Sequence, residues 1–240
     1  MNSFQQLAST LIRTVANSIL SFVLDMKIPW FITMFSEQLL APKPGTLVGW
    51  FALMRMEDRN RESSKVMVQW LDPKPSSVVV EIGPGHGMAL ESLLKEYQPS
   101  RVYGIEISEA FRQKLQSKFA EQLASGLLSI HNHDAKHLPF LHEASVDYIY
   151  ALNVIYFLNP LSEYLAEIYR ILKPGGTILF GISTAVASVI CDPTYFVNTD
   201  WDACTEAIKL AGFENVVRGE GVPRKRGLLV PISAQKPMLV

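Results

Sequence analysis

From residue 78 onward, short β-branched runs alternate with amphipathic segments. This alternation is typical of a parallel sheet with helices on both faces, because parallel strands need long crossover connections. The predicted strands are Val78–Ile82, Val102–Ile107, Leu127–Asn132, Val146–Leu152, Thr177–Ile182, Glu214–Gly219 and Leu228–Ala234. The predicted helices between them are Met88–Tyr97, Ala110–Ala124, Pro160–Leu172 and Asp200–Ala211. We therefore predict an α/β fold with a doubly wound, seven-stranded, mostly parallel sheet and an antiparallel strand at its edge.

The start of the chain follows a helical pattern instead. In Phe4–Met26 apolar residues recur every three or four positions, which predicts a helix with one apolar stripe. Ile28–Leu40 is apolar enough for a second helix, and prolines and a glycine separate it from a third predicted helix, Leu47–Leu71. We predict an N-terminal helical appendage at residues 1–45 and one α/β domain at residues 46–240.

Charged residues interrupt the apolar N-terminus before any stretch reaches the ~20 residues that a membrane-spanning helix needs. We therefore expect no transmembrane helix and, without a secretory signal pattern, a cytoplasmic location. Three roles stay open for the N-terminal helices: packing on the sheet, a lid over a substrate pocket, and peripheral contact with a membrane surface.

The net charge and the cysteine content limit the kinds of partner that we expect. The 240 residues carry a formal net charge of -1, which gives no field strong enough to gather nucleic acid, so we expect no nucleic-acid partner. We interpret the basic run Arg224–Arg226 as a solvated hairpin tip, with contact to a phosphate or an acidic partner as the alternative. Cys191 and Cys204 lack metal-ligand spacing and are predicted to be free thiols.

A glycine-rich stretch, Val80–Gly87, links the first predicted strand to a predicted helix. Glycines let the backbone approach a ligand closely, and the helix start offers free N–H groups, so the stretch predicts a nucleotide-like ligand. A dinucleotide fingerprint requires a small residue three positions after Gly85, but Met88 stands there and the third glycine, Gly87, comes early. This spacing disfavours NAD and an NAD-dependent oxidoreductase.

The motif Glu81-Ile82-Gly83-x-Gly85-x-Gly87 resembles motif I of class I S-adenosylmethionine-dependent methyltransferases. Further segments resemble that family in the same order, and Pro44–Asn60 resembles its type 11, ubiquinone/menaquinone-biosynthesis-like group. The matching later segments are Gly104–Ser108, His133–Phe140, Val146–Asn153 and Ile171–Gly176. The resemblance implies a Rossmann-like fold and S-adenosyl-L-methionine as the cofactor.

The same resemblance implies roles for individual residues. Glu106 would accept both ribose hydroxyls, Asp134 and the N–H of Ala135 would hold adenine, and Asn153 would lie beside the methyl group. The glycine loop would wrap the methionine part. The candidate cofactor-binding residues are Glu81, Gly83, Gly85, Gly87, Glu106, Asp134, Ala135 and Asn153. Asp147, within a strand and away from the expected cofactor edge, is predicted to be structural.

Four of the five histidines lie close together in the sequence: His131, His133, His137 and His142. We predict no metal site, because no cysteine or acidic ligand set completes a closed geometry. One of these histidines, or His86 in the glycine loop, is a candidate general base. Nothing in the sequence chooses among them, so no catalytic residue is assigned.

A sulfonium methyl is already a strong electrophile, so such an enzyme mainly holds the acceptor in line and excludes water. Asn153–Phe157 lacks the Asn/Asp-Pro-Pro-Tyr/Phe pattern of amino-methylating nucleic-acid enzymes. We therefore predict methyl transfer to a small-molecule or lipid-like acceptor. The alternative is a non-catalytic methyltransferase-like binding module. The sequence leaves the oligomeric state undefined.

Overall fold

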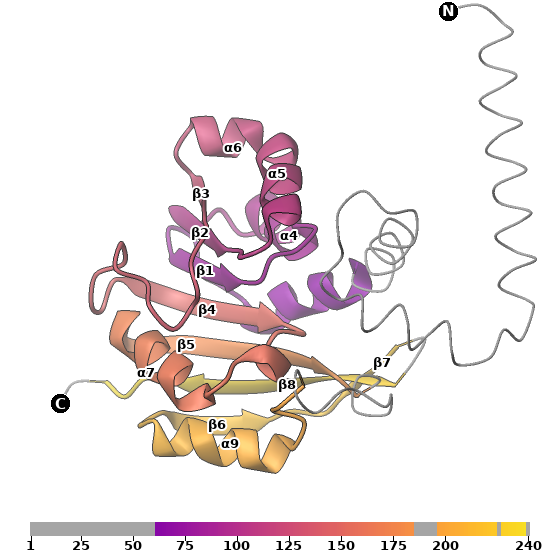
Figure 1. The fold of residues 1–240 in the computed structure, drawn as a ribbon, viewed down its shortest axis with the longest axis vertical. Helices are drawn as coiled ribbons and strands as arrows, with labels where there is room; N and C mark the ends of the chain where they lie inside the picture. The colour runs from indigo at the N-terminus through magenta and orange to yellow at the C-terminus, as the bar shows by residue number, and fades with distance from the viewer. Residues whose placement is uncertain (1–60, 185–195, 225–226, 239–240) are drawn as a thin grey trace, which may run out of the picture. The chain divides into compact units, whose positions relative to one another are not determined.

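A single sheet organises the part of the chain that the computed structural model describes, namely residues 61–184, 196–224 and 227–238. Its strand order is β3-β2-β1-β4-β5-β8-β6, with β7 paired to β8 outside this path (Figure 1). The strands are β1 (Val78–Ile82), β2 (Arg101–Ile105), β3 (Leu128–His131), β4 (Val146–Leu152), β5 (Leu172–Ser183), β6 (Glu214–Arg218), β7 (Val222–Pro223) and β8 (Leu228–Gln235).

Helices connect these strands and cover both faces of the sheet. They are α4 (Met88–Glu96), α5 (Glu109–Lys118), α6 (Ala120–Ala124), the short 3-10 helix η1 (Ile155–Phe157), α7 (Leu161–Ile171) and α9 (Trp201–Leu210), and residues 61–71 are also helical. In Figure 1, α4 and α5 lie beside β1 and β2, whereas α7 and α9 lie against the β5–β6 half.

Side chains alternate between two cores across the sheet. On β1, Val79 packs into one cluster with Met67 and Leu90, whereas its neighbour Val80 packs into the other with Leu165. Because β1 is buried on both faces, it is a nearly continuous apolar run rather than an alternating one. Each fully buried large aliphatic side chain contributes about 1.5–3 kcal/mol.

The predicted fold class is confirmed, with differences in detail. β1 to β5 pair in parallel, and β8 runs antiparallel to both β5 and β6, so the reversed strand lies one position inside the edge strand β6. The structure adds the two-residue strand β7, which pairs with β8. The predicted helix Ala110–Ala124 is divided at Phe119, whose ring is buried beneath the glycine loop.

Asp147 is the second residue of β4 and lies at the edge of the sheet where β1 and β5 also begin. Its Oδ2 accepts a hydrogen bond from the N–H of Val78 at 2.8 Å, and its Oδ1 accepts one from Nζ of Lys173 at 2.8 Å. The carboxylate therefore ties three elements together at the amino edge of the sheet, in agreement with the predicted structural role.

The predicted appendage, residues 1–45, and Cys191 lie outside the described residues, so these predictions stay untested. Among the helices that the structure describes, none is long and apolar enough to cross a membrane. Cys204 is unpaired and buried, and burial raises the pKa of its thiol to about 11. All described residues belong to one compact unit. Its parallel strands β1 to β5 end at one carboxyl edge, which is where open α/β sheets bind their ligands.

Candidate functional site

The loop between β1 and α4 has a left-handed backbone at each of its glycines. Gly83, Gly85 and Gly87 have φ of +69°, +52° and +69°. The N–H of Gly83 donates to the carbonyl of Ile105 at 2.9 Å, and that of Gly87 donates to Pro84 at 2.8 Å. No side chain caps the start of α4. Its first N–H groups, which carry the positive end of the helix dipole, thus lie beside the loop.

The glycines differ in what surrounds them. A Cβ on Gly87 would lie 2.6 Å from both Leu115 Cδ2 and Phe119 Cε2, and one on Gly83 would lie 2.6 Å from Val154 Cγ2. A Cβ on Gly85 would meet nothing within 4 Å. Packing against α5 and the end of β4 therefore requires the outer two glycines, and the loop is open at Gly85.

Lys118, at the end of α5, supports this loop. Its Nζ lies 2.8 Å from Glu91 Oε2 and 3.4 Å from the carbonyl oxygens of His86 and Gly87. The hydrogen bond from Lys118, followed by that from Lys95, lowers the pKa of the Glu91 carboxyl to about 2. Lys118 thus joins α5 to the glycine loop and to the first turn of α4.

Glu106 follows β2 and is 6% exposed. Its Oε2 accepts from the N–H of Gly85 at 3.0 Å, and its Oε1 accepts from the N–H of Ser108 at 2.8 Å. Burial raises the pKa of this carboxyl, whereas the backbone hydrogen bonds from Ser108 and Gly85 act in the opposite direction. Each oxygen has a further lone pair, so the fixed carboxylate retains capacity for two hydroxyl donors.

Ile107 comes directly after Glu106 and is 72% exposed. A large apolar side chain at the carboxyl edge offers a flat contact surface beside the acid. Sequence reasoning missed this residue, although an apolar residue in a polar turn after the predicted strand was a visible signal.

Asp134 and Ala135 lie in the loop after β3. Their loop reaches the same edge, because the N–H of Glu106 donates to the carbonyl of His131, the last residue of β3, at 3.0 Å. The Asp134 side chain is 47% exposed, whereas Ala135 is buried. Burial and then the hydrogen bond with Asp134 raise the pKa of Tyr164, on α7, to about 12. Tyr164 was not recognised in the sequence.

Asn153 ends β4 with a φ of +57°, a conformation that asparagine tolerates better than most residues. Its Oδ1 accepts from the N–H of Ser183 at 3.0 Å, and the Tyr156 hydroxyl donates to the carbonyl of Ser183 at 3.0 Å. Asn153 therefore fixes the carboxyl ends of β4 and β5 to each other. Beyond it, Phe157 is 45% exposed, and its ring centroid lies 5.0 Å from that of Phe196.

Glu81 differs from the other predicted residues because its side chain is inside the core. It is 2% exposed, and its Oε2 accepts a hydrogen bond from the Tyr150 hydroxyl at 2.7 Å. Burial raises the pKa of Glu81 to about 8. The carboxyl group is thus mainly protonated at neutral pH and supports β1 and β4 from within.

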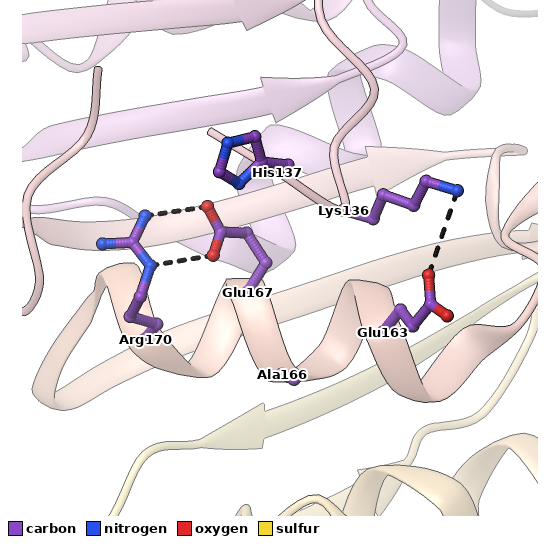
Figure 2. Close-up of a pocket in the computed structure, with 6 residues that line it drawn as sticks. All are labelled: Lys136, His137, Glu163, Ala166, Glu167 and Arg170. Atoms are coloured by element: carbon purple, nitrogen blue, oxygen red, sulfur yellow. Dashed lines mark hydrogen bonds and ion pairs between the residues drawn. The ribbon is translucent and has the colours of Figure 1, made fainter. Parts of the chain in front are cut away.

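A separate groove of about 530 Å³ runs along α7, lined by Lys136, His137, Glu163, Ala166, Glu167 and Arg170 (Figure 2). Its charges are matched: Arg170 Nη2 lies 2.7 Å from Glu167 Oε1, and Lys136 Nζ lies 3.9 Å from Glu163 Oε2. Glu167 also accepts from the N–H of Leu138 at 2.6 Å. The groove contains none of the predicted cofactor residues, and its ion pairs support the loop that follows Ala135.

Two of the clustered histidines, His131 and His133, take part in aromatic packing. His131 stacks on Phe140 with ring centroids 3.8 Å apart, and its Nε2 lies 3.0 Å from Ser129 Oγ. His86 packs edge-on against Phe111. Among the described residues, no three His, Cys, Asp or Glu side chains are grouped so that they could hold a metal ion.

The structure thus brings most of the predicted residues to the carboxyl edge of the sheet, but not the side chain of Glu81. Glu106 is hydrogen-bonded to Gly85, and Asn153 precedes Val154, which packs on Gly83. Asp134 and Ala135 reach the same edge through β3, whereas the Glu81 carboxyl lies in the core. The arrangement is a glycine loop, an open helix start and a buried carboxylate at the carboxyl edge of an α/β sheet, which is the design of a nucleotide-binding enzyme.

Comparison with known proteins specifies this class. Residues 80–180 match the family model described as the methyltransferase domain. The chain is 28% identical over 167 residues to the biotin biosynthesis bifunctional protein BioHC of Teredinibacter turnerae, covering 67% of this chain and 28% of the relative. It is 29% identical over 134 residues to a malonyl-[acyl-carrier protein] O-methyltransferase of Methylovorus, covering 54% and 43%.

These alignments span less than half the length of either relative. Among solved structures, phosphoethanolamine N-methyltransferase 2 of Haemonchus contortus, in complex with S-adenosyl-L-methionine, shares the fold with a TM-score of 0.68. The two sequences are 16% identical, and the match covers 85% of this chain and 60% of that one. The predicted Rossmann-like fold is confirmed, and the matched family model agrees with the predicted methyltransferase family.

The two glycine positions should differ in their effect on stability. Gly87→Ala adds the strain of a left-handed alanine, about 1–2 kcal/mol, and forces Leu115 and Phe119 to move, which costs about 1–3 kcal/mol more. Gly85→Ala adds only the strain, because the space there is open. Urea unfolding of both variants should show the larger loss for Gly87→Ala, and equal losses would contradict this packing.

Stability should also depend on the ionisation of Glu81. The folded pKa of Glu81, about 8, lies above the ordinary pKa of a glutamate, 4.5. The stabilising contribution is therefore complete below about pH 4.5 and is lost as the pH rises through 8. We expect the free energy of unfolding of the wild type to fall between pH 5 and pH 9 relative to Glu81→Gln, measured by urea unfolding at each pH. Parallel curves would exclude a buried, proton-holding Glu81; the exposed Glu121→Gln is the control.

Proposed function

We propose that this chain transfers a methyl group from S-adenosyl-L-methionine to a small-molecule or lipid-like acceptor. The observation that carries the proposal is the contact between Glu106 and the open glycine loop. The buried carboxylate is held by the N–H groups of Gly85 and Ser108, so it is preorganised beside the one loop glycine that has free space around it.

The residues at this edge fit the cofactor. Glu106 would accept the two ribose hydroxyls, and the exposed side chain of Ile107 would pack on the adenine ring. Asp134 would accept from the exocyclic amine, and the N–H of Ala135 would donate to the ring. The loop at Gly85 and the uncapped start of α4 would hold the methionine part.

Bound there, the cofactor supplies an electrophilic methyl group on a sulfonium, and the protein positions the acceptor and excludes water. Asn153 directly follows β4 and would lie beside this methyl group. Its hydrogen bond to Ser183 keeps the ends of β4 and β5 rigid, so the acceptor meets a fixed surface. No described side chain is assigned as a general base.

Three observations support the acceptor class. The exposed ring of Phe157, which packs against Phe196, gives the edge beyond Asn153 an apolar surface. Relatives named as malonyl-[acyl-carrier protein] O-methyltransferases also favour an acyl-type acceptor with an oxygen nucleophile. The near-zero net charge favours small acceptors over nucleic acid.

Glu106→Gln should weaken the binding of S-adenosylhomocysteine by about tenfold or more, because hydrogen bonds to a charged group contribute about 1.5–3 kcal/mol. Calorimetric titration measures the affinity, and thermal unfolding checks that the variant is folded. The matched control is Glu109→Gln in the adjoining turn, whose side chain is 66% exposed and pairs with Arg112. Equal affinities of the wild type and Glu106→Gln would refute the ribose role.

Phe157→Ala should lower kcat/KM for apolar acceptors by about tenfold while S-adenosylhomocysteine affinity stays unchanged, because burying an exposed aromatic ring against a ligand contributes about 1–3 kcal/mol. Methyl transfer from isotopically labelled cofactor to medium-chain carboxylic acids and phenols measures this. The control is Leu210→Ala, an apolar residue 81% exposed at the far end of α9. Cofactor binding without turnover on any acceptor would favour the non-catalytic binding module.

A further inference from the structure

The hairpin formed by β7 and β8 lies at the same edge of the sheet as the glycine loop. Leu229 pairs with Ser183, the last residue of β5, and the N–H of Leu228 donates to Thr184 Oγ1 at 2.8 Å. Because Asn153 holds Ser183, a short stretch of backbone joins the proposed methyl position to the hairpin. Figure 1 shows β7 at the end of the sheet toward which the arrows of β4 and β5 point.

Arg224 is in the turn of this hairpin, where its N–H donates to the carbonyl of Gly227 at 3.0 Å. Its side chain is only 14% exposed, so the prediction of a solvated tip is wrong for this residue. The side chain lies against the start of the helix at residues 61–71, where Nη1 is 3.7 Å from Glu62 Oε2. The sequence pattern could not predict this contact, because Glu62 is far from Arg224 along the chain.

The guanidinium has an unused edge. Its Nε and Nη2 are buried and have no hydrogen-bond partner among the residues that the structure describes. A buried donor without a partner costs about 1–3 kcal/mol, and arginine cannot avoid this by losing its proton. Nε and Nη2 lie along the same edge of the planar guanidinium and donate in parallel, which matches two oxygens of one carboxylate or phosphate.

Arg101 also has an unpaired side-chain donor, but it differs from Arg224 in the number of unpaired donors and in location. Nε of Arg101 also lacks a partner, but its Nη1 donates to the carbonyl of Gly126, and the residue begins β2 at the amino edge. Arg224 instead leaves a two-donor edge unpaired at the carboxyl edge. Glu62, its ion-pair partner among the described residues, is 74% exposed, so this long contact borders solvent and an entering anion can displace it.

We propose that Arg224 binds an oxyanion, a carboxylate or a phosphate, on a ligand at the carboxyl edge, with Glu62 as the carboxylate that competes for the same cation. The inference rests on the proposed function, which brings two anions to this edge. One is the methionine carboxylate of the cofactor, and the other is an acidic group on the acceptor.

The first arm of the test concerns the cofactor. Calorimetry compares S-adenosylhomocysteine with 5′-methylthioadenosine, which lacks the amino-acid carboxylate, on the wild type and on Arg224→Gln. A loss of tenfold or more for S-adenosylhomocysteine, with 5′-methylthioadenosine unchanged, assigns Arg224 to the methionine carboxylate. Arg224→Lys keeps the charge but not the two parallel donors, and should recover the affinity only in part.

The second arm concerns the acceptor. Protein saturated with S-adenosylhomocysteine is titrated with octanoate, with octanol as the uncharged match, and with inorganic phosphate. Binding of octanoate or phosphate to the wild type that weakens tenfold or more in Arg224→Gln assigns the residue to an acidic acceptor group. Arg218→Gln is the control, because Arg218 also pairs with an exposed acid, Asp202, but lies on β6.

Glu62→Gln should change the anion affinity in the opposite direction. This test does not depend on whether Arg224→Gln folds. Removing the competing carboxylate should strengthen binding of the same anion several-fold, whereas an ion pair with only a structural role would lose stability and leave binding unchanged. The proposal is overturned if the wild type binds S-adenosylhomocysteine and both substitutions leave every affinity unchanged. A wild type that binds neither nucleoside overturns the proposed function itself, and the inference with it.

Discussion

The carboxylate of Glu106 is the constraint on which the site depends. It is nearly inaccessible to water, and its two oxygens are held by N–H groups from two different loops. Because a buried acid is stable only when hydrogen bonds offset its desolvation, the loop at Gly85 and the turn at Ser108 must keep their positions. A group that ligands would use is therefore also the group that holds the ligand loop in place.

Side chains from the segment that follows β2 also hold the glycine loop in position. Leu115 and Phe119 press against Gly87, and Lys118 connects α5 to the loop and to Glu91. A helix that follows β2 thus determines the shape of a loop that follows β1. The open side is left at Gly85, so rigidity is concentrated where the backbone touches the core and free space occurs where a ligand must enter.

The sequence alone predicted most of the fold, because parallel strands buried on both faces leave apolar runs that local reasoning detects. The positions of the loop glycines and of Glu106 were predictable for the same reason, since both lie at the ends of such runs. Contacts between segments that are distant in the sequence were not predictable in this way. The partner of Glu81 is Tyr150, 69 residues away, and the ion-pair partner of Arg224 is Glu62, near the other end of the described chain. Phe119 divides a helix because its ring is needed beneath Gly87.

The strand order separates the candidate ligand contacts along the carboxyl edge into two groups. Connections reverse direction between β1 and β4, which are neighbours in the sheet, and a ligand at such a switch point touches both halves. Glu106, Ile107 and Asp134 lie on the β1–β3 side, whereas Phe157 and Arg224 lie on the side of β4, β5 and β8. An acceptor on that second side would meet an aromatic surface and a cation with two unused donors. An apolar molecule that carries one acidic group satisfies both, because its apolar part covers Phe157 while its oxygens pair the guanidinium edge that the folded chain leaves without a partner.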